Sequence, residues 1–259
     1  QAPEGYIGWV CGSIERMNGR ELQARLQKPT IIVTCQYAKS YSKADIYSQS
    51  VSDVVIGNIF TLDGKEDNFY KIIYPDGREA YIEKQNAKEV DSWLTDIELT
   101  GKSIVNTAKQ LMGVPYVWGG TSSKGLDCSG FTKIIYWLHG IIIPRDASQQ
   151  VLCGVEVDNK GDFEKVQKGD LLFFGTKATD ENTKERVVHV GIYIGNKQFI
   201  HAHDYIRINS FNPHDKLFDQ FNTNRYLRTM RYIGSERAIG ITPILDHPFY
   251  SKTSLTDDE

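Results

Sequence analysis

Cysteine and proline are scarce in this 259-residue sequence, which contains four and eight of them. The cysteines lie far apart, at Cys11, Cys35, Cys128 and Cys153, and show no paired spacing. Such a pattern favours neither a disulfide framework nor a zinc ribbon. We therefore expect Cys128 to be a free thiol.

Long apolar runs and basic runs are also missing. No apolar stretch approaches the roughly 20 residues that cross a bilayer, and the first residues lack the charged and apolar regions of a signal peptide. We expect no membrane span, and a chain in a mature or trimmed form. The net charge is −3 and the pI is near 6.1, and no arginine–lysine run is available to bind phosphates. Nucleic acid is therefore not an expected partner.

The hydrophobic content of 40% is sufficient for one sizeable core and one or two smaller ones. We expect a soluble monomer of two or three domains.

Cys128 lies where a helix is expected to begin. Residues 119–125 are rich in turn formers, and Asp127 offers a short carboxylate as N-cap. Apolar residues at positions 131, 134, 135 and 138 form a helical stripe, and Gly140 is a natural stop. A helix N-terminus favours thiolate over thiol and lowers a cysteine pKa. Cys128 is thus a candidate nucleophile, although a small buried hydrophobe is an equally good interpretation of its position alone.

A predicted hairpin supplies two histidines. Residues 187–194 and 198–203 read as strands joined by residues 195–197. If the loop has three residues, His189 and His201 are diagonal neighbours on one face. A two-residue loop would place them on opposite faces. A cysteine peptidase needs a base and a polar group that orients it, so we assign His189 as base and His201 as orienter.

A zinc site is the alternative for these histidines, because His203 could join His189 and His201 as a third ligand. No carboxylate or cysteine falls at ligand spacing nearby, so we expect no metal and no cofactor.

Four short segments precede His201 in a fixed order, and they are VPYVWGG at 114–120, DCSGF at 127–131, KGDLLFF at 168–174 and HVGIY at 189–193. In order and spacing, these segments and His201 resemble the NlpC family of papain-like cell-wall cysteine peptidases. The resemblance is strong over residues 103–204 and weaker to about residue 235. It implies an α+β papain-like domain in which a helix-borne cysteine packs on an antiparallel sheet.

The resemblance also implies roles for individual residues. Cys128 is similar to the family nucleophile, His189 to the base and His201 to the third member of the triad. Tyr116 resembles the tyrosine whose hydroxyl lies beside the nucleophile and helps to hold the oxyanion, although an ordinary half-buried aromatic is as good an interpretation.

Further residues resemble those that contact the substrate. Asp127 and Ser129 look like the pair that binds the free amino end of a short peptide, and an N-cap role for Asp127 is compatible with this. Arg145 and Asp146 lie in a segment similar to one that lines the groove, where a surface turn and helix cap is the plain alternative.

An internal repeat marks the N-terminal third. Residues 3–10 align without gaps on residues 75–82, each a tight turn followed by a strand. Strand-like runs at 30–37, 54–60 and 69–74 make residues 29–83 resemble a bacterial SH3 domain, a small all-β barrel. Tyr6, in the first copy, resembles a tyrosine that reaches the active site in related multidomain peptidases, whereas the second copy has Arg78 there.

Four segments are predicted from these features. Residues 1–26 are the closing strand of a truncated first SH3-like barrel plus a linker helix, and residues 27–92 are a second SH3-like barrel. Residues 93–235 are the peptidase, and residues 236–259 are a loosely ordered polar tail.

The resemblance further implies a substrate. It is a peptidoglycan stem peptide with a free N-terminal L-alanine, cut between γ-D-glutamate and a diamino acid in murein turnover or recycling. Such an enzyme is expected in the periplasm or cell envelope, or alternatively in the cytoplasm. An acyltransferase of the same fold and a non-catalytic cell-wall-binding protein are the competing interpretations.

Overall fold

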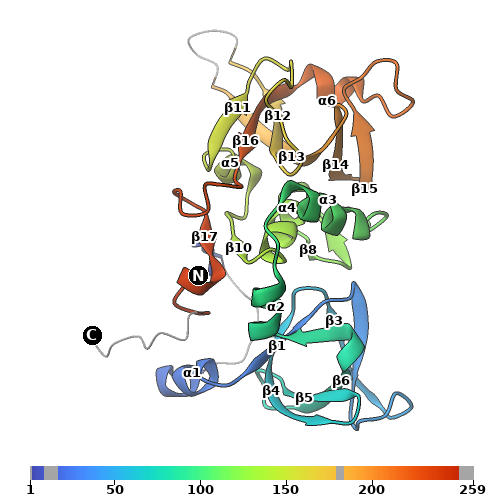
Figure 1. The fold of residues 1–259 in the computed structure, drawn as a ribbon, viewed down its shortest axis with the longest axis vertical. Coiled ribbons are helices and arrows are strands. Elements are labelled where there is room, and N and C mark those ends of the chain that lie inside the picture. Colours follow the sequence, from blue (N-terminus) through green and yellow to red (C-terminus); the bar gives the residue numbers. More distant parts are fainter. Residues whose placement is uncertain (1, 9–16, 179–183, 251–259) are drawn as a thin grey trace. The chain divides into compact units, whose positions relative to one another are not determined.

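The computed structural model describes residues 2–8, 17–178 and 184–250, and it divides into two compact units (Figure 1). One unit contains Gln1–Tyr6 and Glu98–Ile244, and the other contains Ile7–Ile97 and Leu245–Glu259. Among the described residues, no helix is both long and apolar enough to span a membrane.

The unit centred on residues 7–97 is built on a seven-stranded antiparallel sheet of order β3-β2-β6-β5-β4-β1-β7. Helix α1 (Gly19–Leu26) precedes it, capped by Asn18, whose side chain accepts the Glu21 amide at 2.9 Å. The strands are β1 (Thr30–Val33), β2 (Tyr37–Tyr41), β3 (Ser50–Val55), β4 (Ile59–Glu66), β5 (Phe69–Ile73), β6 (Glu79–Glu83) and β7 (Ala87–Glu89). The short helices η1 (Lys84–Asn86) and α2 (Val90–Asp96) flank β7.

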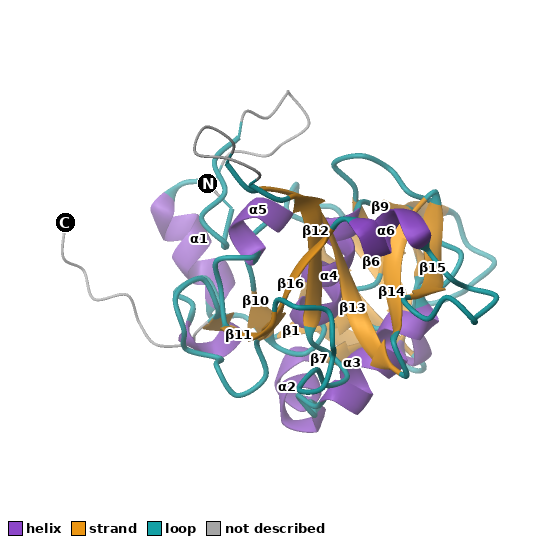
Figure 2. Ribbon diagram, turned by 90° about the horizontal axis from the view of Figure 1, so that it is seen from above, coloured by secondary structure: helices purple, strands orange, loops and turns teal. Residues whose placement is uncertain are grey.

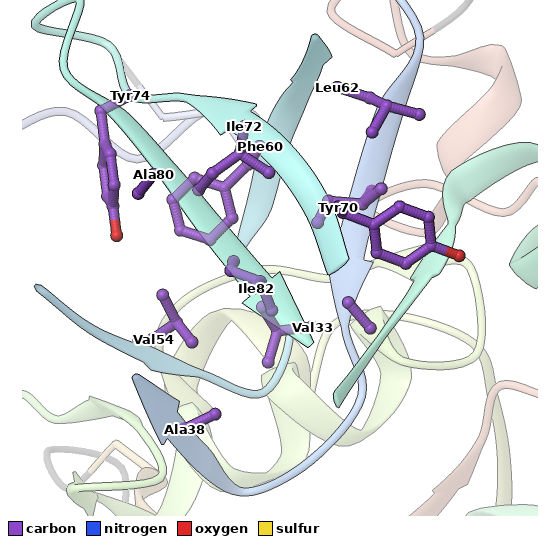
Figure 3. Packing of buried hydrophobic residues seen from close by; sticks show 12 residues of the cluster. Val33, Ala38, Val54, Phe60, Leu62, Tyr70, Ile72, Tyr74, Ala80 and Ile82 are labelled. Carbon is purple, nitrogen blue, oxygen red and sulfur yellow. The ribbon is translucent and has the colours of Figure 1, made fainter. Parts of the chain in front are cut away.

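A single hydrophobic core holds this sheet together. Alternate residues of the strands point inward, as the period of two in a strand requires, and Val33, Ile72 and Ile82 are fully buried there (Figure 3). Among the described strands, β3 and β7 are the two edges of the ladder, so the hydrogen-bonded sheet is open and not a closed barrel.

The internal repeat is visible as a repeated turn. Gly77 donates its amide to Tyr74 O, and the Tyr74 amide is bonded to Arg78 O at 2.8 Å. Gly5 and Ala2 make the equivalent bonds, with the Ala2 amide 2.8 Å from Tyr6 O. Gly5 and Gly77 have φ of 83° and 84°, a region that favours glycine. The strand predicted after the first turn is wrong for residues 6–8, which form no strand, while Trp9 and Val10 lie outside the described residues.

The other unit contains a six-stranded antiparallel sheet of order β11-β16-β12-β13-β14-β15 (Figure 2). Its strands are β11 (Val155–Asp158), β12 (Leu171–Thr176), β13 (Arg186–Gly195), β14 (Gln198–His203), β15 (Tyr205–Ser210) and β16 (Tyr226–Arg231). The helices are α3 (Gly101–Gln110), α4 (Cys128–Trp137), α5 (Ala147–Gln150) and α6 (Gln220–Asn224). The strand pair β8 (Thr121–Ser122) and β9 (Gly125–Leu126) precedes α4.

Helix α4 begins and ends close to the predicted positions. Its apolar face packs on β13 and β14, and Phe131 and Ile135 are fully buried, whereas the predicted stripe residues Ile134 and Leu138 are only half-buried. Gly140, with φ of 74°, follows the end of the helix.

The segment after Ser235 is more ordered than predicted. Strand β17 (Thr242–Pro243) pairs with β10 (Ile141–Ile142), and the short helix η2 (Ile244–Asp246) follows. Ile241 and Ile244 are buried. These apolar side chains fasten the segment to the unit that carries α4, so a loose polar tail starting at residue 236 is wrong.

The β13–β14 hairpin corrects one detail of the prediction. Asn196 and Lys197 form a two-residue turn with φ of 55° and 57°, as a tight hairpin turn requires. The register nevertheless pairs Ile192 with Ile200, the register of a three-residue loop, because it shifts by one between Tyr193 and Gly195. This bulge leaves one extra residue in β13 and returns the histidines to one face.

Candidate active site

The start of α4 is fixed by Asp127. Its carboxylate accepts the Gly130 amide at 2.7 Å, which satisfies one free donor of the first helical turn. Its other oxygen accepts the Gly119 amide at 2.9 Å and so holds the preceding loop against the helix. Gly130 is required there, because a Cβ atom would come within 2.1 Å of Gly120 O.

Cys128 follows this cap directly, and its side chain is buried at 8% exposure. Helix α4 packs on β13, and the amide of Val190, next to His189 in that strand, lowers the pKa of the Cys128 thiol. The first residue of α4 is thereby placed beside the strand that carries His189.

Burial changes the expected chemistry of this thiol. Burial raises the pKa of Cys128 above its usual 9.0, and the negative charge of Asp127 raises it further. Amide hydrogen bonds from Val190 and the helix start lower the pKa by less. The expectation of a lowered pKa is therefore wrong, and the resting group is a neutral thiol that needs a base.

The structure brings His189 and His201 together. Nε2 of His189 lies 2.7 Å from Nδ1 of His201, and the rings meet edge to face with centroids 5.0 Å apart. Gly191 lies between them in β13, and a Cβ atom there would come within 3.1 Å of the His201 Cβ. Its lack of a side chain lets the two rings approach.

Both histidines are neutral at neutral pH. Burial lowers the pKa of His189 well below its usual 6.5, and the neighbouring His201 and Arg225 lower it further. Burial lowers the pKa of His201 to about 4. A neutral imidazole can accept the proton of a neutral thiol, so His189 has the protonation state that a general base requires.

Tyr116 is half-buried near the same thiol. Its amide donates to Asp204 O at 2.8 Å, and it forms a bridge with Leu126, which fixes its backbone beside the loop before α4. Burial raises the pKa of Tyr116, and negative charge on Cys128 raises it as well. The hydroxyl therefore remains protonated and can donate a hydrogen bond.

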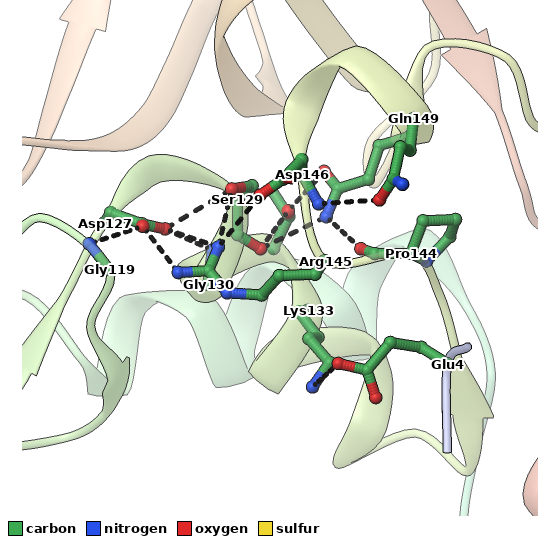
Figure 4. Close-up of polar contacts among 12 residues, drawn as sticks. Glu4, Gly119, Asp127, Ser129, Gly130, Lys133, Pro144, Arg145, Asp146 and Gln149 are labelled. Carbon is green, nitrogen blue, oxygen red and sulfur yellow. Dashed lines mark hydrogen bonds and ion pairs between the residues drawn. The ribbon is translucent and has the colours of Figure 1, made fainter. Parts of the chain in front are cut away.

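Arg145 forms an ion pair with the carboxylate of Asp127 (Figure 4). Its Nη2 lies 2.6 Å from one carboxylate oxygen and its Nη1 lies 3.1 Å from the other, and Nη1 also donates to Ser129 Oγ at 2.9 Å. This two-pronged ion pair is nearly buried, with 11% and 10% of the two side chains exposed. Both carboxylate oxygens of Asp127 therefore already accept hydrogen bonds, and its expected role in binding a substrate amine stays a prediction.

Asp146 and Tyr6 are more accessible. The Asp146 carboxylate lies 4.0 Å from Arg145 Nη1 and is 47% exposed, and its backbone precedes α5. Tyr6 is 42% exposed. The segment that carries Tyr6 is attached to α4 by an ion pair of 2.8 Å between Glu4 and Lys133 (Figure 4).

A metal centre is not formed by the three histidines. Within residues 2–8, 17–178 and 184–250, no group of three or more histidine, cysteine, aspartate or glutamate side chains has metal-binding geometry. His203 Nδ1 instead lies 3.3 Å from the Asp204 carboxylate.

Sequence reasoning missed Asn209. Its Oδ1 lies 2.9 Å from His201 Nε2, so it is the next member of the histidine chain. It reaches His201 only through the pairing of β14 with β15, where His201 faces Arg207. Strand alternation from Arg207 could have placed Asn209 on the same face as His201.

The chain shares sequence and structure with known proteins. Residues 113–231 match the model of the NlpC/P60 family. A gamma-D-glutamyl-L-lysine dipeptidyl-peptidase of Bacillus cereus is 36% identical over 199 residues, which cover 77% of this chain and 57% of that protein. One of the same name from Bacillus subtilis is 30% identical over 205 residues, which cover 77% and 61%.

Residues 113–231 are an NlpC/P60 domain. A crystal structure of an NlpC/P60 family protein from Bacillus cereus superposes with a TM-score of 0.67 at 33% identity, covering 83% of this chain and 66% of that one. The chain spans less than two thirds of the length of the two peptidases named above. The NlpC/P60 domain contains Cys128, His189, His201 and Asn209.

The raised pKa of Cys128 predicts a distinctive alkylation profile. Only the thiolate reacts, so the iodoacetamide rate at Cys128 should rise about tenfold per pH unit from pH 6 to 9. Cys128→Ala gives the background from the other cysteines. A thiolate–imidazolium pair would instead give a rate that is constant from about pH 5 to 8, and that outcome would contradict the neutral thiol.

Proposed function

We propose that this chain is a cysteine peptidase that hydrolyses peptidoglycan stem peptides. One observation carries the proposal. The Val190 amide lowers the pKa of the Cys128 thiol at the start of α4, and Val190 is the neighbour of His189, which is paired with His201 at 2.7 Å. A candidate nucleophile, base and orienting group are thus carried by α4 and by the two strands packed against it, β13 and β14, as covalent catalysis requires.

The proposed reaction has two halves. The Cys128 sulfur attacks the scissile carbonyl carbon as its proton passes to His189. The resulting oxyanion accepts hydrogen bonds from the Cys128 amide at the start of α4 and from the Tyr116 hydroxyl. His189 then protonates the leaving amine and the C–N bond breaks, which leaves a thioester. Water, deprotonated by His189, hydrolyses the thioester and restores the thiol.

The scissile bond is proposed to join γ-D-glutamate to a diamino acid. Support comes from the names of the two Bacillus relatives and from the charge of the site. A γ-linked glutamate keeps a free α-carboxylate close to the scissile bond. Arg145 and Ser129, beside Cys128, are suited to bind that carboxylate, because a guanidinium already held by Asp127 requires little ordering.

Recognition of a free L-alanine amine is assigned to Asp146 and Tyr6. Asp127 is saturated by Arg145, whereas the Asp146 carboxylate is 47% exposed. An ammonium needs an accessible acceptor, so the role expected of Asp127 is transferred to its more exposed neighbour. Asp127 becomes the group that positions Arg145 and α4.

The domains and the compartment of the chain are proposed in keeping with this function. Residues 27–92 are proposed to be an SH3-like domain, on the basis of the seven short antiparallel strands around one core. The peptidase unit is proposed to comprise Glu98–Ile244 together with Gln1–Tyr6, in place of the expected bounds of residues 93–235. The peptide substrate suggests the cell envelope, or the cytoplasm if the peptides are recycled.

Cys128→Ala should abolish hydrolysis of L-Ala-γ-D-Glu-diaminopimelate while leaving peptide binding intact, because the sulfur is the attacking atom. Release of the diamino acid is measured by chromatography and binding by calorimetry. Cys35→Ala, in the other unit, is the matched control and should retain activity. Continued turnover by the Cys128→Ala protein would refute the mechanism.

The contact proposed for Arg145 predicts a preference for a free α-carboxylate. Replacing γ-D-glutamate by γ-D-isoglutamine removes that charge and should lower kcat/KM roughly ten- to a hundredfold, the value of a charged hydrogen bond. Arg145→Gln should lose the preference, and Arg78→Gln, an exposed arginine of the other unit, should keep it. Equal kcat/KM for the two peptides in the unmodified protein would exclude this contact.

Assignment of the amine to Asp146 predicts a preference for free over N-acetylated L-alanine, again by roughly tenfold or more. Asp146→Asn should reduce the ratio of the two kcat/KM values towards one. Asp162→Asn, an exposed aspartate elsewhere in the domain, should not. Equal rates on both peptides would remove amine recognition altogether, and an unchanged ratio in Asp146→Asn would remove only Asp146.

A further inference from the structure

We propose that Asn209 is a positioning residue that fixes the protons of the His189–His201 pair, so that the free lone pair of His189 lies on Nδ1. The inference rests on the proposed role of His189 as base. It adds a fourth member to the candidate triad.

The orientation of the Asn209 side-chain amide is set by two partners with fixed roles. Arg207 Nε, which can only donate, lies 3.0 Å from Asn209 Oδ1. Leu217 O, which can only accept, lies 3.2 Å from Asn209 Nδ2. Turning the amide over would place its NH₂ group against the Arg207 donor and its oxygen against the Leu217 carbonyl acceptor. Asn209 therefore presents its carbonyl oxygen, and not its NH₂ group, to His201.

The carbonyl of Asn209 decides the tautomer of His201. Asn209 Oδ1 lies 2.9 Å from His201 Nε2 and can only accept, so the proton of the neutral ring is on Nε2. His201 is fully buried, which favours the neutral form. Its Nδ1 atom then carries a lone pair.

His201 in turn decides the tautomer of His189. Since His201 Nδ1 is an acceptor, the bond of 2.7 Å requires the proton on His189 Nε2. Nδ1 of His189 is left unprotonated, and it is the only ring nitrogen of His189 that can take the thiol proton. The opposite tautomer would leave the ring with no lone pair for Cys128.

The next group after Asn209 in this hydrogen-bonded series is a cation, because Arg207 Nε donates to the Asn209 oxygen, and Arg207 Nη1 lies 3.5 Å from the exposed Asp204 carboxylate. None of His201, Asn209 and Arg207 carries a negative charge that would stabilise a protonated His189. The charged or titratable groups that act on the two histidines lie on β14, on β15 and at the two ends of α6, and they are His203, Arg207, Asp219 and Arg225. Asp219 raises the pKa of His201, whereas the other three lower the pKa of one ring or of both and so favour the neutral form.

Two substitutions separate this role from simple packing. Asn209→Asp keeps an acceptor for His201 and for Arg207 but adds a negative charge, which should raise the pKa of His201 by about one unit or more. Asn209→Leu removes the acceptor, so His201 can exchange its proton between the two nitrogens. Ser210→Ala, a fully buried change at the next residue of β15, is the matched control.

The decisive measurement is ¹⁵N NMR of the histidine rings in the full chain, with kcat/KM followed against pH. In the unmodified protein both His189 and His201 should be protonated on Nε2 alone at pH 7. Asn209→Leu should lose at least about tenfold in kcat with KM nearly unchanged. Asn209→Asp should recover much of that loss and move the acid limb of kcat/KM to higher pH. Ser210→Ala should change neither tautomer nor limb.

A proton on Nδ1 of His189 in the unmodified protein would overturn the proposal. The same follows if Asn209→Asp leaves both the His201 pKa and the acid limb in place. The NMR result does not require turnover, so it stands if the peptidase assignment fails, and a failure of the tautomer assignment leaves the Cys128→Ala test unaffected. If Asn209→Leu does not fold, the unmodified protein and Asn209→Asp still decide the question.

Discussion

The hydrogen bond between His189 and His201 depends on one extra residue in a hairpin. A two-residue turn alone would put the two rings on opposite faces of the sheet, because side chains alternate along a strand. The register shift between Tyr193 and Gly195 restores them to one face. Gly191 then allows the rings to approach, and β15 brings Asn209 behind them. The candidate base, its orienter and the residue that sets their protons therefore all follow from the geometry of this hairpin.

Asp127 likewise contacts several parts of the candidate site. Its carboxylate starts α4 through Gly130, holds the loop through Gly119 and binds Arg145. A buried carboxylate with so many donors is stabilised by its partners, and losing any one would leave a desolvated charge. The same ion pair fixes a cationic group close to Cys128. One aspartate therefore couples the position of the nucleophile to the position of the group proposed to read the substrate carboxylate.

Local patterns in the sequence predicted the parts of the site that depend on neighbouring residues. The start of α4 at Cys128 and the strands that carry His189 and His201 follow from caps, turns and β-branched runs. Features that require distant partners were missed or wrong. Arg145 is 18 residues from Asp127, and Asn209 meets His201 through strand pairing. The pKa of Cys128 depends on burial by the whole domain, which outweighs the local helix terminus. The folding of residues 236–244 likewise depends on β10, far away in the sequence.

A neutral resting site is the physical consequence of these contacts. Burying a thiolate and an imidazolium would require desolvation of two charges, and their attraction repays this only with excellent geometry. In the proposed arrangement, the side-chain amide of Asn209 fixes which nitrogen of each histidine carries the proton, and it does so without adding a negative charge to the site. In the proposed reaction, charge develops only when the thiol attacks a bound carbonyl, and the amide of Cys128 and the Tyr116 hydroxyl are the proposed donors to it. Hydrogen bonds that form only in the transition state lower the activation barrier without stabilising the resting enzyme. Such interactions are the ones that raise kcat. A carboxylate in place of Asn209 would favour the protonated histidine before substrate arrives, and part of that advantage would be lost.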